Sequence, residues 1–139
     1  MKKLIKYCLS LLLLTTAGDA AKAQYHLNLD GVNDYVRVTP YAALQGSSGV
    51  TVEAWINATA WKTPIYKGSV ICTGNNVGQN NGFDLRAAEN GKAEFNVSIA
   101  GNWTTATSAP IMQTGVWYHL AGVYSGDSIM IYINGVLRG

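Results

Sequence analysis

Residues 82–99 read GFDLRAAENGKAEFNVSI, and their pattern decides the fold class. On both sides of Asn90-Gly91, apolar residues alternate with polar ones, as they do when successive side chains of a strand point to opposite faces. Asn-Gly is a strong signal for a tight hairpin, because both turn positions need a positive φ. The stretch therefore predicts a β-hairpin whose apolar face holds Phe83, Leu85, Phe95, Val97 and Ile99. We expect the opposite face to lie in water; it holds Asp84, Arg86, Glu94, Asn96 and Ser98.

Short alternating runs separated by turn residues continue outward from this hairpin in both directions. Strands are expected at residues 25–29, 35–38, 50–56, 118–124 and 128–133. In the last of these, Met130 and Tyr132 make the second face apolar too, so we expect it to be covered or to line a shallow groove. No stretch shows sustained helical periodicity. The pattern is typical of an all-β, antiparallel two-sheet sandwich.

Residues 1–23 differ from the rest and predict a secretory signal peptide. A basic start is followed by the apolar run Tyr7–Ala17, and Ala21-Lys22-Ala23 supplies small residues two apart. These three features predict cleavage between Ala23 and Gln24. The apolar run is shorter than the roughly 20 residues that a membrane-spanning helix needs. We expect a secreted protein, extracellular or at the cell surface, with no membrane insertion after cleavage.

Charge and cysteine content exclude some partners. Without residues 1–23, six basic and seven acidic residues remain, a net charge of −1. Such a chain has no electrostatic basis for binding nucleic acid or anionic membranes. Cys8 leaves with the leader, so Cys72 has no intramolecular disulfide partner. We expect Cys72 to be a small buried strand residue; the alternative is an outward-facing reactive thiol.

Four segments, in order, resemble the laminin G-like (LamG-like) branch of the concanavalin A-like lectin/glucanase jelly rolls. They are LNLDGVNDYV (27–36), VTVEAWI (50–56), GFDL (82–85) and WYHLAGVY (117–124), the last followed by IYINGV (131–136). The resemblance implies two antiparallel sheets packed face to face in a jelly roll over residues 24–139. Family members usually continue past the last Asn-Gly turn with further strands, so we interpret the chain as a fragment whose domain is incomplete at the C-terminus.

Catalytic patterns are missing from the sequence. Glycan-cleaving enzymes of this sandwich class place carboxylates as E-x-D-x-x-E, but Glu53 is followed by Ala54 and Trp55. The motifs G-x-S-x-G, H-E-x-x-H and C-x-x-C are also absent. His26 and His119 lie in strand patterns and are interpreted as structural residues. We expect a protein that is not an enzyme.

Candidate binding residues are of two kinds. A sugar ring can stack on Trp61 or Trp103, and amides near residues 74–82 suit sugar hydroxyls; these amides are Asn75, Asn76, Asn80 and Asn81. The alternatives are aromatic caps of the core and a solvated loop. Trp55 and Trp117 lie inside strand signatures and are assigned to packing.

The turn near residue 30 carries oxygen ligands of the type that Ca²⁺ prefers, on Asp30, Asn33 and Asp34. The alternative is that these residues simply suit a tight turn. A structural Ca²⁺ is therefore one expectation for this turn, and no other cofactor is expected.

Together these features favour a secreted, non-catalytic carbohydrate-binding or adhesion module whose partner is a glycan or an extracellular protein. One alternative is a protein-binding or spacer module of a larger surface protein. Another is the accessory fragment of a glycan-processing enzyme.

Overall fold

The computed structural model describes residues 25–38, 48–73 and 82–139. The chain divides into two units, Met1–Arg37 and Val38–Gly139, which are described separately. The predicted signal peptide lies outside the described residues, and so do Asn75, Asn76, Asn80 and Asn81. In the part that is described, no helix is long and apolar enough to cross a membrane.

The strands expected at residues 25–29 and 35–38 are not found. Residues 25–38 form no strand, and their side chains are exposed, Tyr25 and Tyr35 among them. Alternation alone does not make a strand, because the backbone N–H and C=O groups need a neighbouring strand as partner. The turn within this segment is present, with bends at residues 31–33 and a positive φ at Gly31.

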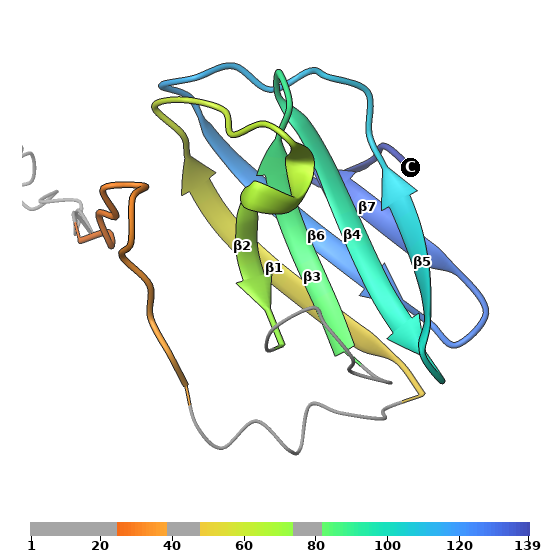
Figure 1. Ribbon diagram of the computed structural model, residues 1–139. Helices are drawn as coiled ribbons and strands as arrows, with labels where there is room; N and C mark the ends of the chain where they lie inside the picture. The colour runs from red at the N-terminus through yellow and green to blue at the C-terminus, as the bar shows by residue number, and fades with distance from the viewer. Residues whose placement is uncertain (1–24, 39–47, 74–81) are drawn as a thin grey trace, which may run out of the picture. The chain divides into compact units, whose positions relative to one another are not determined.

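The second unit contains two antiparallel four-stranded sheets, as expected from the sequence (Figure 1). The first sheet has the order β1-β6-β7-β8, with strands β1 (Val50–Asn57), β6 (Trp117–Tyr124), β7 (Ile129–Ile133) and β8 (Val136–Leu137). The second has the order β2-β3-β4-β5, with strands β2 (Ser69–Cys72), β3 (Gly82–Ala88), β4 (Lys92–Ile99) and β5 (Asn102–Thr107). A short 3-10 helix, η2 (Ile65–Lys67), precedes β2.

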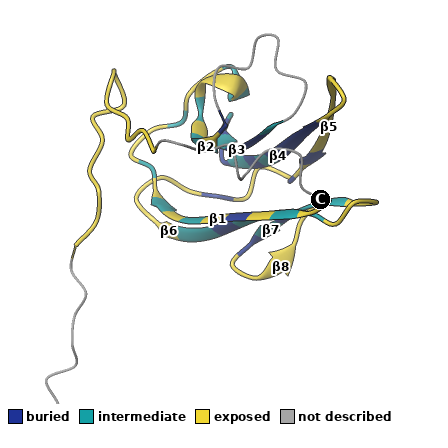
Figure 2. Cartoon of the chain, turned by 90° about the horizontal axis from the view of Figure 1, so that it is seen from below, coloured by how far each residue is buried: buried dark blue, intermediate teal, exposed yellow. Residues whose placement is uncertain are grey.

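The core lies between the two sheets, where their apolar faces meet (Figure 2). The second sheet contributes Phe83, Leu85, Phe95 and Val97, as predicted, whereas Ile99 is exposed at the end of β4. The first sheet contributes Val52, Leu120, Ile131 and Ile133. Phe95 and Leu120 have no exposed surface, so the centre of this layer is closed to water.

The β3–β4 hairpin turns through three residues. Ala88 pairs with Lys92, and Glu89, Asn90 and Gly91 all have positive φ. A side chain at Gly91 has no room, because a Cβ there would lie 2.0 Å from the backbone oxygen of Met112. The Asn-Gly signal thus located the hairpin correctly, and the turn is one residue longer than a two-residue loop.

Candidate functional site

The outer face of the β2-β3-β4-β5 sheet gathers polar side chains from all four strands. Cross-strand register places Arg86 opposite Glu94, Asp84 opposite Asn96, and Asn96 opposite Thr105. We call this surface the polar face; its members are Ser69, Asp84, Arg86, Glu94, Asn96, Ser98, Trp103, Thr105 and Thr107. It is opposite to the core because strand residues alternate between the two faces of a sheet.

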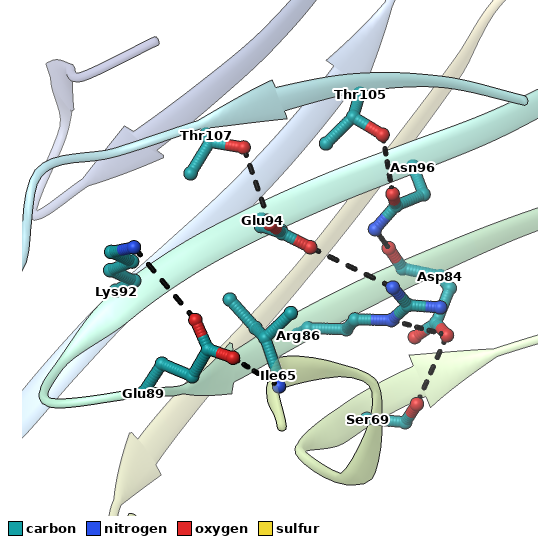
Figure 3. Close-up of polar contacts among 10 residues, drawn as sticks. All are labelled: Ile65, Ser69, Asp84, Arg86, Glu89, Lys92, Glu94, Asn96, Thr105 and Thr107. Carbon is teal, nitrogen blue, oxygen red and sulfur yellow. Dashed lines mark hydrogen bonds and ion pairs between the residues drawn. The ribbon is translucent and has the colours of Figure 1, made fainter. Parts of the chain in front are cut away.

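Asp84 is the centre of a charged network on the polar face (Figure 3). Its Oδ2 atom accepts hydrogen bonds from Arg86 Nε at 2.8 Å and from Ser69 Oγ at 3.0 Å. The Nη1 atom of Arg86 lies 3.7 Å from Glu94 Oε2, so one guanidinium group contacts two carboxylates. The side chain of Asp84 has no exposed surface, and that of Arg86 is 13% exposed.

The network continues onto β5 through uncharged groups (Figure 3). Thr105 Oγ1 donates a hydrogen bond to Asn96 Oδ1 at 2.6 Å. The Nδ2 atom of Asn96 donates to the backbone oxygen of Asp84 at 3.4 Å, and Thr107 Oγ1 donates to Glu94 Oε1 at 3.4 Å. Thr105 and Thr107 are exposed. Their hydroxyl groups therefore form an accessible rim beside a buried polar layer.

The polar face is less exposed than the sequence pattern suggested. Asp84, Asn96 and Ser98 are buried, although the alternation predicted a side in water. Buried polar groups are retained when hydrogen bonds replace their contacts with water. The network supplies such bonds to the Oδ2 atom of Asp84 and to the side chain of Asn96. The expectation of a fully solvated face is wrong for Asp84, Asn96 and Ser98.

Of the two tryptophans proposed to stack on sugars, the structure places one on the polar face. Trp103 pairs with Ser98 across the β4–β5 ladder and is 40% exposed. Trp61 is half-buried and packs against the core cluster, the position that an aromatic cap would occupy. An accessible aromatic ring thus lies on the same sheet face as the hydroxyl rim of β5.

In the turn proposed for Ca²⁺, the carboxylates accept hydrogen bonds from backbone N–H groups of the same turn. Asp30 Oδ1 accepts from the N–H groups of Val32 at 2.7 Å and Asn33 at 3.4 Å, and Asp34 Oδ2 accepts from Asp30 N at 3.0 Å. These are the hydrogen bonds of an Asx turn. Across the described ranges, no cluster of three or more His, Cys, Asp or Glu residues is placed to hold a metal ion. Calcium at Asp30, Asn33 and Asp34 stays a prediction.

A second group of side chains, missed at the sequence level, lies on the outer face of the β1-β6-β7-β8 sheet. Trp55 is 66% exposed and Trp117 46%, so the assignment of both to core packing is wrong. On β1, Trp55 alternates with Val52, Ala54 and Ile56. Because those three side chains face inward, the indole of Trp55 faces outward. The signal was therefore present in the sequence.

His119 joins Trp55 on that outer face. The two ring centroids are 5.2 Å apart with the planes tilted by 46°, and His119 Nε2 lies 3.4 Å from Glu53 Oε2. His119 also fixes the β7–β8 turn, because its backbone N–H donates to Asn134 Oδ1 at 2.9 Å. The backbone of His119 is thus part of the strand ladder. We call Trp55, Glu53 and His119 the Trp55 group.

Cys72 is an exposed thiol, not the buried strand residue that the sequence favoured. It ends β2 and pairs with Asp84 across the ladder. Partial desolvation, followed by the negative charge of Asp84, raises the pKa of the Cys72 thiol above its ordinary value. A raised pKa leaves less thiolate at neutral pH, so we expect this exposed thiol to react more slowly than an ordinary cysteine.

Two packed antiparallel sheets define a protein of the β-sandwich class. A family model described as "Concanavalin A-like lectin/glucanases superfamily" matches residues 30–139. The chain belongs to this family. No curated protein and no solved structure gives a significant match to the chain.

Proposed function

We propose that this chain is a non-catalytic carbohydrate-binding module and that glycans bind on its polar face. The observation that carries the proposal is the placement of Trp103 on the same sheet face as Thr105 and Thr107. Binding sites for small molecules combine an aromatic surface with a few fixed polar groups. Here the indole offers a stacking surface. The two hydroxyl groups donate their protons to Asn96 and Glu94, and their oxygens can accept hydrogen bonds from a sugar.

The network beneath this surface supports the proposal because its side chains are already held by hydrogen bonds and an ion pair without any ligand. Asn96 is held by Thr105 and by the Asp84 backbone, and Glu94 is held by Thr107 and Arg86. A preorganised surface loses less conformational entropy on binding than a flexible one. The absence of E-x-D-x-x-E from the sequence is the reason for proposing binding without hydrolysis.

Secretion is part of the proposal and rests on residues 1–23 alone. Glycans of surfaces and matrices lie outside the cell, which agrees with the basic start, the short apolar run and the A-x-A end. Cleavage between Ala23 and Gln24 is tested by mass spectrometry of the exported chain.

The test compares glycan binding of the wild type with that of Trp103→Ala. Loss of the stacking surface is expected to weaken binding at least about tenfold, since truncating an aromatic hot spot costs about 2 kcal/mol or more and a factor of ten corresponds to about 1.4 kcal/mol. Glycan-array signal and titration calorimetry provide the measurement. Trp55→Ala is the matched control, because it removes an exposed tryptophan from the other sheet, and it is expected to bind glycan normally. Equal binding by Trp103→Ala and wild type would sink the proposed site.

A second candidate function, a protein-binding or spacer module, is favoured by the Trp55 group. Trp55 is 66% exposed and Trp117 46% exposed on the same outer face, and exposed apolar groups that gather in one patch mark interaction sites. Tryptophan is also enriched among residues that dominate the binding energy of protein interfaces. A stable protein complex that is lost in Trp55→Ala and retained in Trp103→Ala, without any glycan signal, would favour this function over the first.

A further inference from the structure

The basic side chains of strands β2–β5 are already engaged by carboxylates. In the sequence of strands β2–β5, Arg86 and Lys92 are the two basic residues. Arg86 contacts Asp84 at 2.8 Å and Glu94 at 3.7 Å. Lys92 Nζ lies 3.8 Å from Glu89 Oε2 (Figure 3). These five side chains carry three negative charges and two positive ones, a net charge of −1.

This arrangement has a consequence for the charge of a ligand. Sulfate and carboxylate groups are recognised by guanidinium groups with free N–H donors, frequently in bidentate geometry. The Nε donor of Arg86 is taken by Asp84, and Glu94 lies beside its Nη1. An anionic sugar that approached Thr105 or Thr107 would therefore meet the negative charge of Glu94, while the positive charge of Arg86 is already shared between Asp84 and Glu94.

A neutral sugar meets no such penalty on this surface. Its hydroxyl groups can donate to Glu94 Oε1 or Oε2 and to the hydroxyl oxygens of Thr105 and Thr107. Hydrogen bonds to a charged acceptor are about twice as strong as neutral ones. The feature that repels an acidic sugar thus adds to the binding of an uncharged one.

We propose that the polar face selects uncharged glycans and rejects sulfated and uronate-containing ones, with Glu94 as the residue that determines this selectivity. The inference rests on the proposed function, and it adds the class of ligand. Glu94 is the member of the network suited to this role because its side chain is 15% exposed and accepts from Thr107 at the rim, whereas Asp84 has no exposed surface.

The experiment compares the wild type, Glu94→Gln and the matched control Glu53→Gln on two sets of immobilised probes. One set holds neutral oligosaccharides of hexoses and N-acetylhexosamines; the other holds heparin and polygalacturonate. We expect the wild type to bind at least one neutral probe and to bind the anionic probes at least about tenfold more weakly. Circular dichroism and thermal melting establish that all three proteins are folded.

Glu94→Gln keeps the shape of the side chain and removes its charge, leaving Arg86 paired with Asp84 alone. Binding to the anionic probes is expected to rise about tenfold, the effect of one unit charge at about 6 Å in a medium with an effective dielectric constant of about 40. Glu53→Gln makes the same change in net charge on the other sheet and is expected to leave both sets unchanged.

The outcomes separate the two proposals. Wild-type binding that is as strong on heparin as on neutral probes would overturn the selectivity while the proposed function stands. Unchanged anionic binding in Glu94→Gln, or an equal rise in Glu53→Gln, would overturn the role of Glu94. A wild type that binds no probe of either set would overturn the proposed function and, with it, the inference.

Discussion

At the residue scale, the burial of Asp84 makes Arg86 more important for stability than any other cation on its sheet. Asp84 has no exposed surface, and its Oδ2 atom receives the Arg86 Nε hydrogen bond at 2.8 Å. Removing one partner of a buried pair leaves an uncompensated charge, which typically costs 3–5 kcal/mol. Lys92 and Glu89 are more exposed, at 39% and 32%, and pairs of that kind contribute at most about 1 kcal/mol.

Arg86→Met is therefore expected to lower the free energy of unfolding by about 3 kcal/mol, measured by urea denaturation. The double variant Asp84→Asn/Arg86→Met is expected to be more stable than Arg86→Met, because it removes the stranded charge. Lys92→Met, the control, is expected to change stability by less than about 1 kcal/mol. An Arg86→Met variant as stable as the control would show that the pair contributes little.

The thiol of Cys72 reports on the same network through its reactivity. Desolvation and the charge of Asp84 raise its pKa, while Arg86 acts in the opposite direction. In a Cys8→Ser background, we expect Cys72 to react with iodoacetamide more slowly at pH 8 than a free cysteine does, because less thiolate is present.

Two variants move this pKa with opposite signs. Asp84→Asn removes a cause that raises it, so alkylation should become faster and its pH profile should shift to lower pH. Arg86→Met removes a cause that lowers it, so alkylation should become slower. Shifts of the same sign in both variants would contradict the electrostatic explanation.

At the element scale, strands with a strong alternating pattern were predictable from the sequence, and their exposure was not. The faces of β3 and β4 follow the alternation around Phe83 and Phe95. The solvent exposure of the polar face depends on which residues face each other across the strands, such as Arg86 and Glu94. The alternation within one strand does not indicate these partners. Opposite charges at facing positions of a predicted hairpin are the signal that would have found the network.

The segment at residues 25–38 shows the other limit of element prediction. Its alternation and its resemblance to an opening strand are as clear as those of β1, yet it forms no strand. A strand is a property of two segments, since each satisfies the backbone groups of the other. The candidate site shows the same dependence: Trp103 faces outward next to Thr105 because Ala106 faces the core, and that register is set by pairing with β4.

At the scale of the whole molecule, the two sheets approach each other closely at Gly122 of β6 and Phe95 of β4. A Cβ added at Gly122 would lie 2.3 Å from the Phe95 ring, which is much closer than atoms in van der Waals contact. Phe95 has no exposed surface and cannot move aside into solvent. The distance between the two sheets at this point therefore depends on glycine at position 122, which has no side chain, and on the large ring of Phe95.

Gly122→Ala is expected to lower the free energy of unfolding by about 1–3 kcal/mol, the usual cost of overpacking a well-filled core. The measurement is the midpoint of urea denaturation, compared between variants whose unfolding free energy has the same dependence on urea concentration. Ala121→Ser, one position along β6 on the outer face, is the control and should remain within about 0.5 kcal/mol of wild type. Adding Phe95→Leu to Gly122→Ala should cost less than Phe95→Leu costs in the wild type, because the smaller side chain relieves the overlap. Full additivity of the two substitutions would mean that the sheets do not meet through this contact.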